Sequence, residues 1–150
     1  MKIAVLFGSF NPMTNAHVRA LKKVVEILNA EKGLFVATNG QYLKRKTVKI
    51  GDAFYLTEEE RKQVIDEVCQ NEPKLEFGGF ELGGINPSRF KTLSKIQKQY
   101  PNAKLYEVMG SDKIRTLTMS RHAEDYLSSV NFAVFPRLEI DIDEMFNNNE

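Results

Sequence analysis

The first seventeen residues constrain the fold more than any other part of this 150-residue chain. The apolar run from Ile3 to Phe7 is typical of a strand that is buried on both faces of a parallel sheet. Small and turn-forming residues follow from Gly8 to Pro12, and an amphipathic helical pattern begins near Asn15. This order predicts a buried strand, a tight turn, and a helix that starts at the carboxyl end of the strand.

The start of that helix carries two side chains that suit an anion. Thr14 and His17 are three residues apart, so they lie on one face of a helical turn. The first N–H groups of a helix have no partner within the helix, and the helix dipole favours negative charge beside them. A hydroxyl and an imidazole next to unpaired N–H groups fit a polyphosphate, whereas they fit a catalytic nucleophile much less well.

Strand and helix patterns alternate along the rest of the chain. We expect further strands at residues 34–38, 75–77, 104–109 and 131–135, and helices at about 15–29, 57–71, 88–100 and 123–128. Thr57 and Glu60 form a capping box at one helix start, and Gly33 is the expected terminator of the first helix. The alternation predicts an α/β fold, a Rossmann-like, doubly wound parallel sheet of about five strands in three αβα layers.

Composition excludes several classes of protein. Lys and Arg total 21 and Asp and Glu total 20, so the formal net charge is +1. A general nucleic-acid or membrane-surface binder needs a strongly basic field, so we expect neither partner. No apolar run approaches the length of a membrane span, and we expect a soluble cytoplasmic protein. The single cysteine, Cys69, lies in an apolar helical pattern, which favours a buried, inert thiol.

A doubly wound sheet also predicts where a ligand binds. Ligands lie beyond the carboxyl ends of the strands, where the strand order reverses. Two loops are therefore favoured, residues 8–17 after the first strand and residues 110–112 after the fourth.

The segment GSFNPMTNAH resembles G-[ST]-F-[DN]-P-x-[HT]-x-G-H, the signature of the nucleotidylyltransferases related to class I aminoacyl-tRNA synthetases. Ala16 stands where that signature has Gly. Later segments are most similar to bacterial nicotinate-mononucleotide adenylyltransferases, and they occur in the same order: FVATNGQ, EL followed by PS and TL, YPNAKLY, GSD and FPR. The resemblance extends from about Met1 to Arg137.

The resemblance implies a reaction and a set of site residues. The family transfers AMP from ATP to nicotinate or nicotinamide mononucleotide and releases pyrophosphate, in NAD biosynthesis. It implies an ATP site that includes the backbone of Gly8, Ser9 and Phe10, with Thr14 and His17 at the phosphates. The Mg²⁺ would be carried with ATP, and no metal site formed by the protein is expected.

The remaining residues of the resemblance come from three later segments. Lys44 would neutralise phosphate charge in catalysis, and Gly110 and Asp112 would hold adenosine. The residues expected to bind the mononucleotide are Asn39, Lys46, Ser88 and Thr92. A homo-oligomer is compatible with the sequence, which does not fix the oligomeric state.

Two alternatives stay open at this point. We expect one domain over residues 1–150 that lacks the family's C-terminal I-S-S-T-x-x-R element, because residues 138–150 contain nothing similar. That absence favours a catalytically inactive nucleotide-binding homologue as one alternative. The other is pantetheine-phosphate adenylyltransferase, because residues 14–17, TNAH, are nearer to its T-N-G-H than to H-x-G-H.

Overall fold

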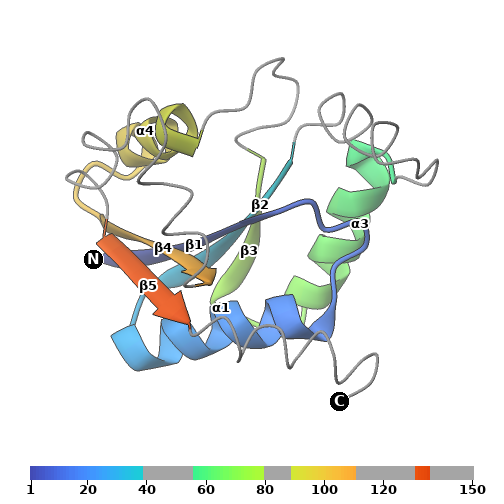
Figure 1. Cartoon of the computed structure of the whole chain (residues 1–150), viewed down its shortest axis with the longest axis horizontal. Helices are drawn as coiled ribbons and strands as arrows, with labels where there is room; N and C mark the ends of the chain where they lie inside the picture. The colour runs from blue at the N-terminus through green and yellow to red at the C-terminus, as the bar shows by residue number, and fades with distance from the viewer. Residues whose placement is uncertain (39–55, 80–88, 111–130, 136–150) are drawn as a thin grey trace.

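A computed structural model of the chain describes residues 1–38, 56–79, 89–110 and 131–135. Five strands in these ranges form one sheet in the order β3-β2-β1-β4-β5 (Figure 1). Every neighbouring pair is parallel, so the carboxyl ends of the strands face the same edge of the sheet. The strands are β1 Lys2–Gly8, β2 Lys32–Ala37, β3 Leu75–Gly78, β4 Lys104–Gly110 and β5 Asn131–Phe135.

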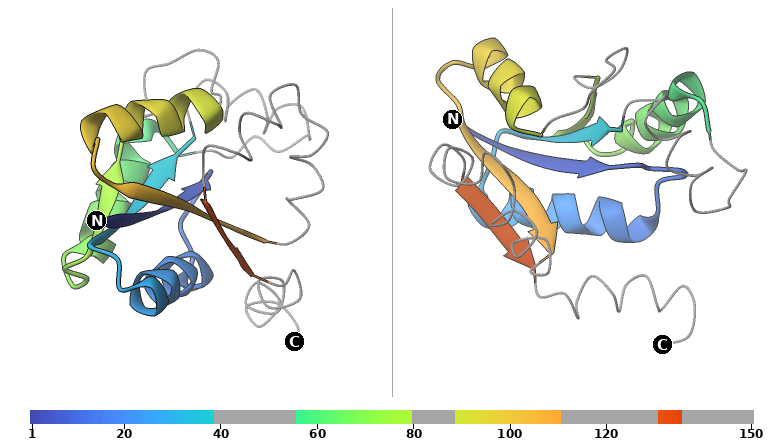
Figure 2. Two further views of the ribbon diagram at one scale, coloured as in Figure 1. Left: turned by 90° about the vertical axis from the view of Figure 1, so that its left-hand side faces the viewer. Right: turned by 45° about the horizontal axis from the view of Figure 1, so that its top comes forward.

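Three helices cover the two faces of the sheet. They are α1 Asn15–Leu28, α3 Glu58–Cys69 and α4 Arg89–Gln99. α1 and α3 pack on one face and α4 packs on the other, and Figure 2 shows the sheet lying between α4 and α1. The predicted three-layer, doubly wound architecture is confirmed.

The side chains of β1 alternate between the two faces, as the period of a strand requires. Ile3 and Val5 belong to the apolar cluster beneath α4, whereas Ala4 belongs to the cluster beneath α1 and α3. All three are 0% exposed. A continuous apolar sequence is therefore needed at residues 3–5, because both faces of this part of the strand are buried.

The structure confirms that the first helix ends near residue 29 and corrects the residue that terminates it. Gly33 does not terminate it, because α1 ends at Leu28 and Asn29 adopts the left-handed conformation with φ 54°. The N–H of Asn29 donates back to the carbonyls of Glu26 and Val25, which closes the last turn. Asn tolerates a positive φ better than most residues, so glycine is not required at this position.

Gly33 instead lies within β2, where it permits α1 to approach the sheet. A Cβ at this position would lie 2.9 Å from Leu21 Cγ and 2.9 Å from Val25 Cγ2. Both of these side chains are buried on α1. The glycine is therefore required by close packing between helix and strand and not by a turn.

The other predicted elements agree with the structure to within a few residues. Thr57 Oγ1 accepts the N–H of Glu60, and Glu60 Oε1 accepts the N–H of Thr57, which confirms the capping box that opens α3. α3 ends at Cys69, two residues before the expected end, and α4 ends before Pro101 as expected. The short helix predicted at residues 123–128 lies outside the described residues.

Candidate active site

The candidate site lies where the strand order reverses, between β1 and β4. Their parallel register pairs Leu6 with Val108, so Gly8 and Gly110 end the two strands at the same level. α1 leaves β1 on one face at this point, which places its amino-terminal end at the carboxyl edge of the sheet (Figure 1). This is the place where doubly wound folds bind ligands.

The turn after β1 is shaped by the packing of Phe10. Phe10 has φ 49° and is 2% exposed, so its ring turns back beneath the loop. A Cβ on Gly8 would lie 2.8 Å from this ring, a contact that only glycine avoids. The ring also makes edge-to-face contacts with His17 at 5.1 Å and with Phe35 at 5.7 Å between centroids. The loop and the start of α1 are thereby fixed against β2.

Four hydrogen bonds from distant segments hold this loop. The N–H and the hydroxyl of Thr38 donate to the carbonyl of Gly8 at 2.9 and 3.1 Å. The Nη1 of Arg61 donates to the carbonyl of Ser9 at 2.9 Å. The N–H of Leu56 donates to Asn11 Oδ1 at 2.6 Å. The loop is therefore positioned by β2 and by the start of α3, not by local geometry alone.

Thr14 and His17 are in contact at the start of α1. The N–H of Thr14 donates to His17 Nδ1 at 3.0 Å, and Thr14 Oγ1 lies 3.2 Å from the same nitrogen. Nδ1 is thus an acceptor, and a neutral ring must carry its proton on Nε2. Burial lowers the pKa of His17 below its usual 6.5, which favours this neutral form. His17 therefore carries an N–H donor on Nε2 near neutral pH.

This arrangement suits a group of negatively charged oxygens. The first turn of α1 contains no acidic side chain. The N–H groups of Asn15 and Ala16 have no acceptor within the helix because they belong to its first turn. Together with Nε2 of His17, these donors form a compact anion-binding surface at the carboxyl edge of the sheet.

The structure brings together five of the residues that the sequence predicts: Gly8, Ser9, Phe10, Thr14 and His17. Gly110 ends the adjacent strand. Thr92 lies in α4 and is 3% exposed. Five more predicted residues lie outside the described residues, so their roles stay predictions. They are Asn39, Lys44, Lys46, Ser88 and Asp112.

Sequence reasoning missed Arg61, whose side chain is 0% exposed and reaches the loop from α3. The signal that could have found it is helical spacing. Arg61 lies four residues before Ile65, which is fully buried, so the two side chains share one face of α3. An arginine on the apolar face of a helix is uncommon and indicates a specific partner.

Other expectations concern metals, thiol chemistry and membranes. Within the described ranges no group of three or more His, Cys, Asp or Glu side chains could hold a metal ion. Burial raises the pKa of Cys69 to about 11, so its thiolate is scarce at neutral pH. No helix in the described part of the chain is long and apolar enough to cross a membrane.

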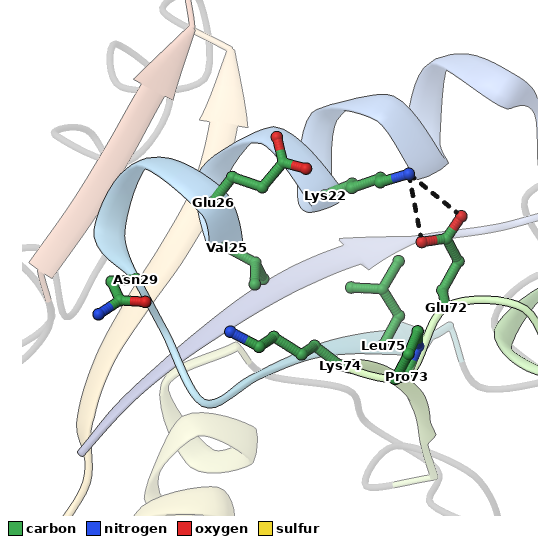
Figure 3. A pocket seen from close by; sticks show the side chains of 8 residues that line it. All are labelled: Lys22, Val25, Glu26, Asn29, Glu72, Pro73, Lys74 and Leu75. Atoms are coloured by element: carbon green, nitrogen blue, oxygen red, sulfur yellow. Dashed lines mark hydrogen bonds and ion pairs between the residues drawn. The ribbon is translucent and has the colours of Figure 1, made fainter.

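A separate cavity of about 470 Å³ lies between α1 and the segment that leads into β3 (Figure 3). Val25 and Leu75 contribute apolar lining, and an ion pair of 3.4 Å joins Lys22 to Glu72 beside them. Leu75 begins β3, so this cavity lies at the amino-terminal edge of the sheet, opposite the loop after β1. It is therefore distinct from the candidate site.

A parallel sheet that reverses its order beside this loop, together with an anion-binding helix start, is typical of nucleotide-binding α/β proteins. The chain belongs to the cytidylyltransferase-like family, whose profile matches residues 5–150. The resemblance predicted from the sequence is confirmed.

Individual relatives give the same assignment. The chain is 26% identical over 137 residues to a probable nicotinate-nucleotide adenylyltransferase/Ap4A hydrolase of Mycoplasma pneumoniae, covering 91% of this chain and 38% of that protein. It is 28% identical over 138 residues to a probable nicotinate-nucleotide adenylyltransferase of Aliarcobacter butzleri, covering 91% of this chain and 72% of that protein. The fold matches the Plasmodium falciparum nicotinic acid mononucleotide adenylyltransferase complexed with NaAD, with a TM-score of 0.68, 16% identity, and coverage of 90% and 74%.

Proposed function

We propose that this chain transfers AMP from ATP to nicotinate mononucleotide and releases pyrophosphate, a step in NAD biosynthesis. The observation that carries the proposal is the helix start at the carboxyl edge of the sheet, where His17 offers an Nε2–H beside unpaired backbone donors. The names of the relatives support the reaction and its acceptor.

The reaction needs no nucleophile from the protein. A phosphate oxygen of the mononucleotide attacks the α-phosphorus of ATP in line, and a new P–O bond forms. The bond from the α-phosphorus to the bridging oxygen breaks, and pyrophosphate leaves with the electron pair. Mg²⁺ enters as part of the MgATP substrate. The task of the protein is to position the two substrates and to stabilise negative charge.

The described residues can supply that stabilisation. Nε2–H of His17 would donate to an oxygen of the α-phosphate or of the leaving pyrophosphate, and the hydroxyl of Thr14 lies beside it. The backbone of Gly8 to Phe10 would line the ATP site, and Gly110 would lie beneath the adenosine. These donors are held in place before substrate arrives, which is the condition for large electrostatic catalysis.

The residues outside the described ranges complete the proposal by their resemblance to the family. Lys44 would neutralise phosphate charge, and Asp112 would hold the ribose of ATP. The mononucleotide would contact Asn39, Lys46 and Ser88, together with Thr92 of α4.

A coupled assay tests the proposal. Purified protein is incubated with MgATP and nicotinate mononucleotide, pyrophosphate release is followed continuously, and the dinucleotide is identified by chromatography. Parallel reactions contain nicotinamide mononucleotide or phosphopantetheine as the acceptor. A His17→Ala variant purified in the same way reveals activity that comes from a contaminating host enzyme. The absence of dinucleotide at high enzyme concentration, or faster turnover of phosphopantetheine, would contradict the proposal.

A further inference from the structure

Arg61 is the largest fully buried side chain in the described part of the chain. It lies in the first turns of α3, and its Nη1 donates to the carbonyl of Ser9 in the loop after β1, at 2.9 Å. Fifty-two positions separate these residues in the sequence, and a second bond from Leu56 to Asn11 lies beside this contact. Figure 1 shows the loop passing beside α3.

Two nitrogens of the Arg61 guanidinium, Nε and Nη2, are buried without hydrogen bonds among the described residues. Its Nη1 donates to a neutral carbonyl, that of Ser9. Burial lowers the pKa of Arg61 and Glu58 opposes that shift, but an arginine remains charged at any physiological pH.

A buried charge with unsatisfied donors destabilises a fold relative to an apolar side chain of similar shape. The stability of the protein without nucleotide therefore does not explain why this residue is an arginine. The carbonyl that it holds belongs to the loop whose neighbouring N–H groups and His17 form the anion-binding surface. A positive charge in this low-dielectric position attracts a nearby polyanion more strongly than an exposed charge would.

We infer that Arg61 is a positioning residue of the nucleotide site, which fixes the Ser9 carbonyl and whose buried charge strengthens the binding of a triphosphate at the loop. The inference rests on the proposed function in one respect, that the ligand of the loop is a polyphosphate nucleotide. Part of the cost of burying the charge is recovered only when that anionic ligand binds.

An Arg61→Met variant removes the charge and keeps a side chain of similar shape. We expect its dissociation constant for MgATP to rise at least tenfold by calorimetry, whereas its affinity for adenosine changes less than twofold. Its urea midpoint without nucleotide should equal or exceed that of the wild type. Arg61→Lys, which keeps the charge, should restore part of the ATP affinity.

The matched control is Lys62→Met, one residue further along α3. It removes the same charge from a side chain that is 51% exposed and paired with Asp66. Because water and salt screen that charge, ATP affinity should stay within twofold of the wild type. A tenfold loss in this variant would show that net charge alone controls binding, and would overturn the inference.

Three further results would overturn the inference. In the first, Arg61→Met binds ATP as tightly as the wild type does. In the second, its affinities for ATP and for adenosine fall by the same factor. In the third, the variant is less stable than the wild type, or unfolded, without nucleotide. The third result would show that Arg61 stabilises the fold in the absence of nucleotide. Failure of the proposed function is distinguishable, because a wild type that binds ATP through Arg61 but forms no dinucleotide contradicts only that function.

Discussion

Replacing His17 by glutamine separates the two tasks that the structure gives to this ring. Nδ1 accepts the N–H of Thr14 and so completes the cap of α1, whereas Nε2–H is the donor proposed for phosphate. Glutamine at the third helical position is the residue that accepts the N-cap N–H in a capping box. His17→Gln therefore keeps the cap and removes the imidazole, and His17→Ala removes both.

The expected stabilities follow from these contacts. The cap bond contributes about 1 kcal/mol. The edge-to-face contact with Phe10, at 5.1 Å between centroids, contributes about 1 kcal/mol more. His17→Ala should thus lose about 2 kcal/mol of unfolding free energy and His17→Gln about 1 kcal/mol, as measured by urea titration. Equal losses in the two variants would show that the cap bond contributes nothing.

The expected activities also differ, because alanine offers no donor in place of Nε2–H, whereas the amide of glutamine keeps N–H donors. A preorganised donor to charge that develops in a transition state contributes about 3 kcal/mol, which corresponds to roughly two orders of magnitude in kcat. His17→Ala should lose this much in the pyrophosphate-release assay, under conditions in which it remains folded, and His17→Gln should lose less because its amide can donate. If His17→Ala kept kcat within a few-fold of the wild type, the assigned role of Nε2 would be wrong.

The lowered pKa of His17 also predicts that stability depends on pH, which a comparison of the wild type with His17→Gln tests. The pKa of His17 is lower in the folded protein than its usual 6.5, so the unfolded chain binds the proton more readily. The stability from the neutral ring is complete above pH 6.5 and is lost as the pH falls through the folded pKa. The wild type should therefore lose more stability than His17→Gln between pH 7 and pH 5. An equal loss would show that the pKa is not lowered.

Three other positions give simpler tests. Gly33→Ala should lower the unfolding free energy by about 1–3 kcal/mol in urea titration, because its Cβ would lie 2.9 Å from Leu21 Cγ and from Val25 Cγ2; an unchanged midpoint would contradict this. Asn29→Ala should cost about 1–2 kcal/mol at its positive φ, whereas Asn29→Gly should not, and equal effects would refute the backbone argument. Cys69, with a pKa raised to about 11, should react with a disulfide reagent at pH 8 only after unfolding; rapid native labelling would show an accessible thiolate.

Local patterns were sufficient to predict most of the fold. The strand beginning at Lys2, the capping box at Thr57 and the strand 131–135 each depend on residues that are close in sequence, so periodicity and caps located them. The end of α1 near residue 29 is predicted correctly, but its terminator is not, because glycine is the commonest helix terminator and Asn29 performs that role. Glycine is needed at position 33 because Leu21 and Val25 of α1 pack against it, and a single-sequence pattern does not reveal such packing.

Local patterns likewise predict one part of the candidate site and not another. Thr14 and His17 were predictable because a helix start fixes their spacing, and the structure adds the hydrogen bond that determines which nitrogen is free to donate. The contact between Ser9 and Arg61 was not predictable, because it joins segments that only the folded sheet brings together. A charged residue on the buried face of α3 conflicts with the amphipathic pattern of that helix. Such a conflict between local pattern and packing is expected where function, and not stability, determines the residue. The prediction that Arg61→Met preserves the fold but weakens triphosphate binding follows directly from that conflict.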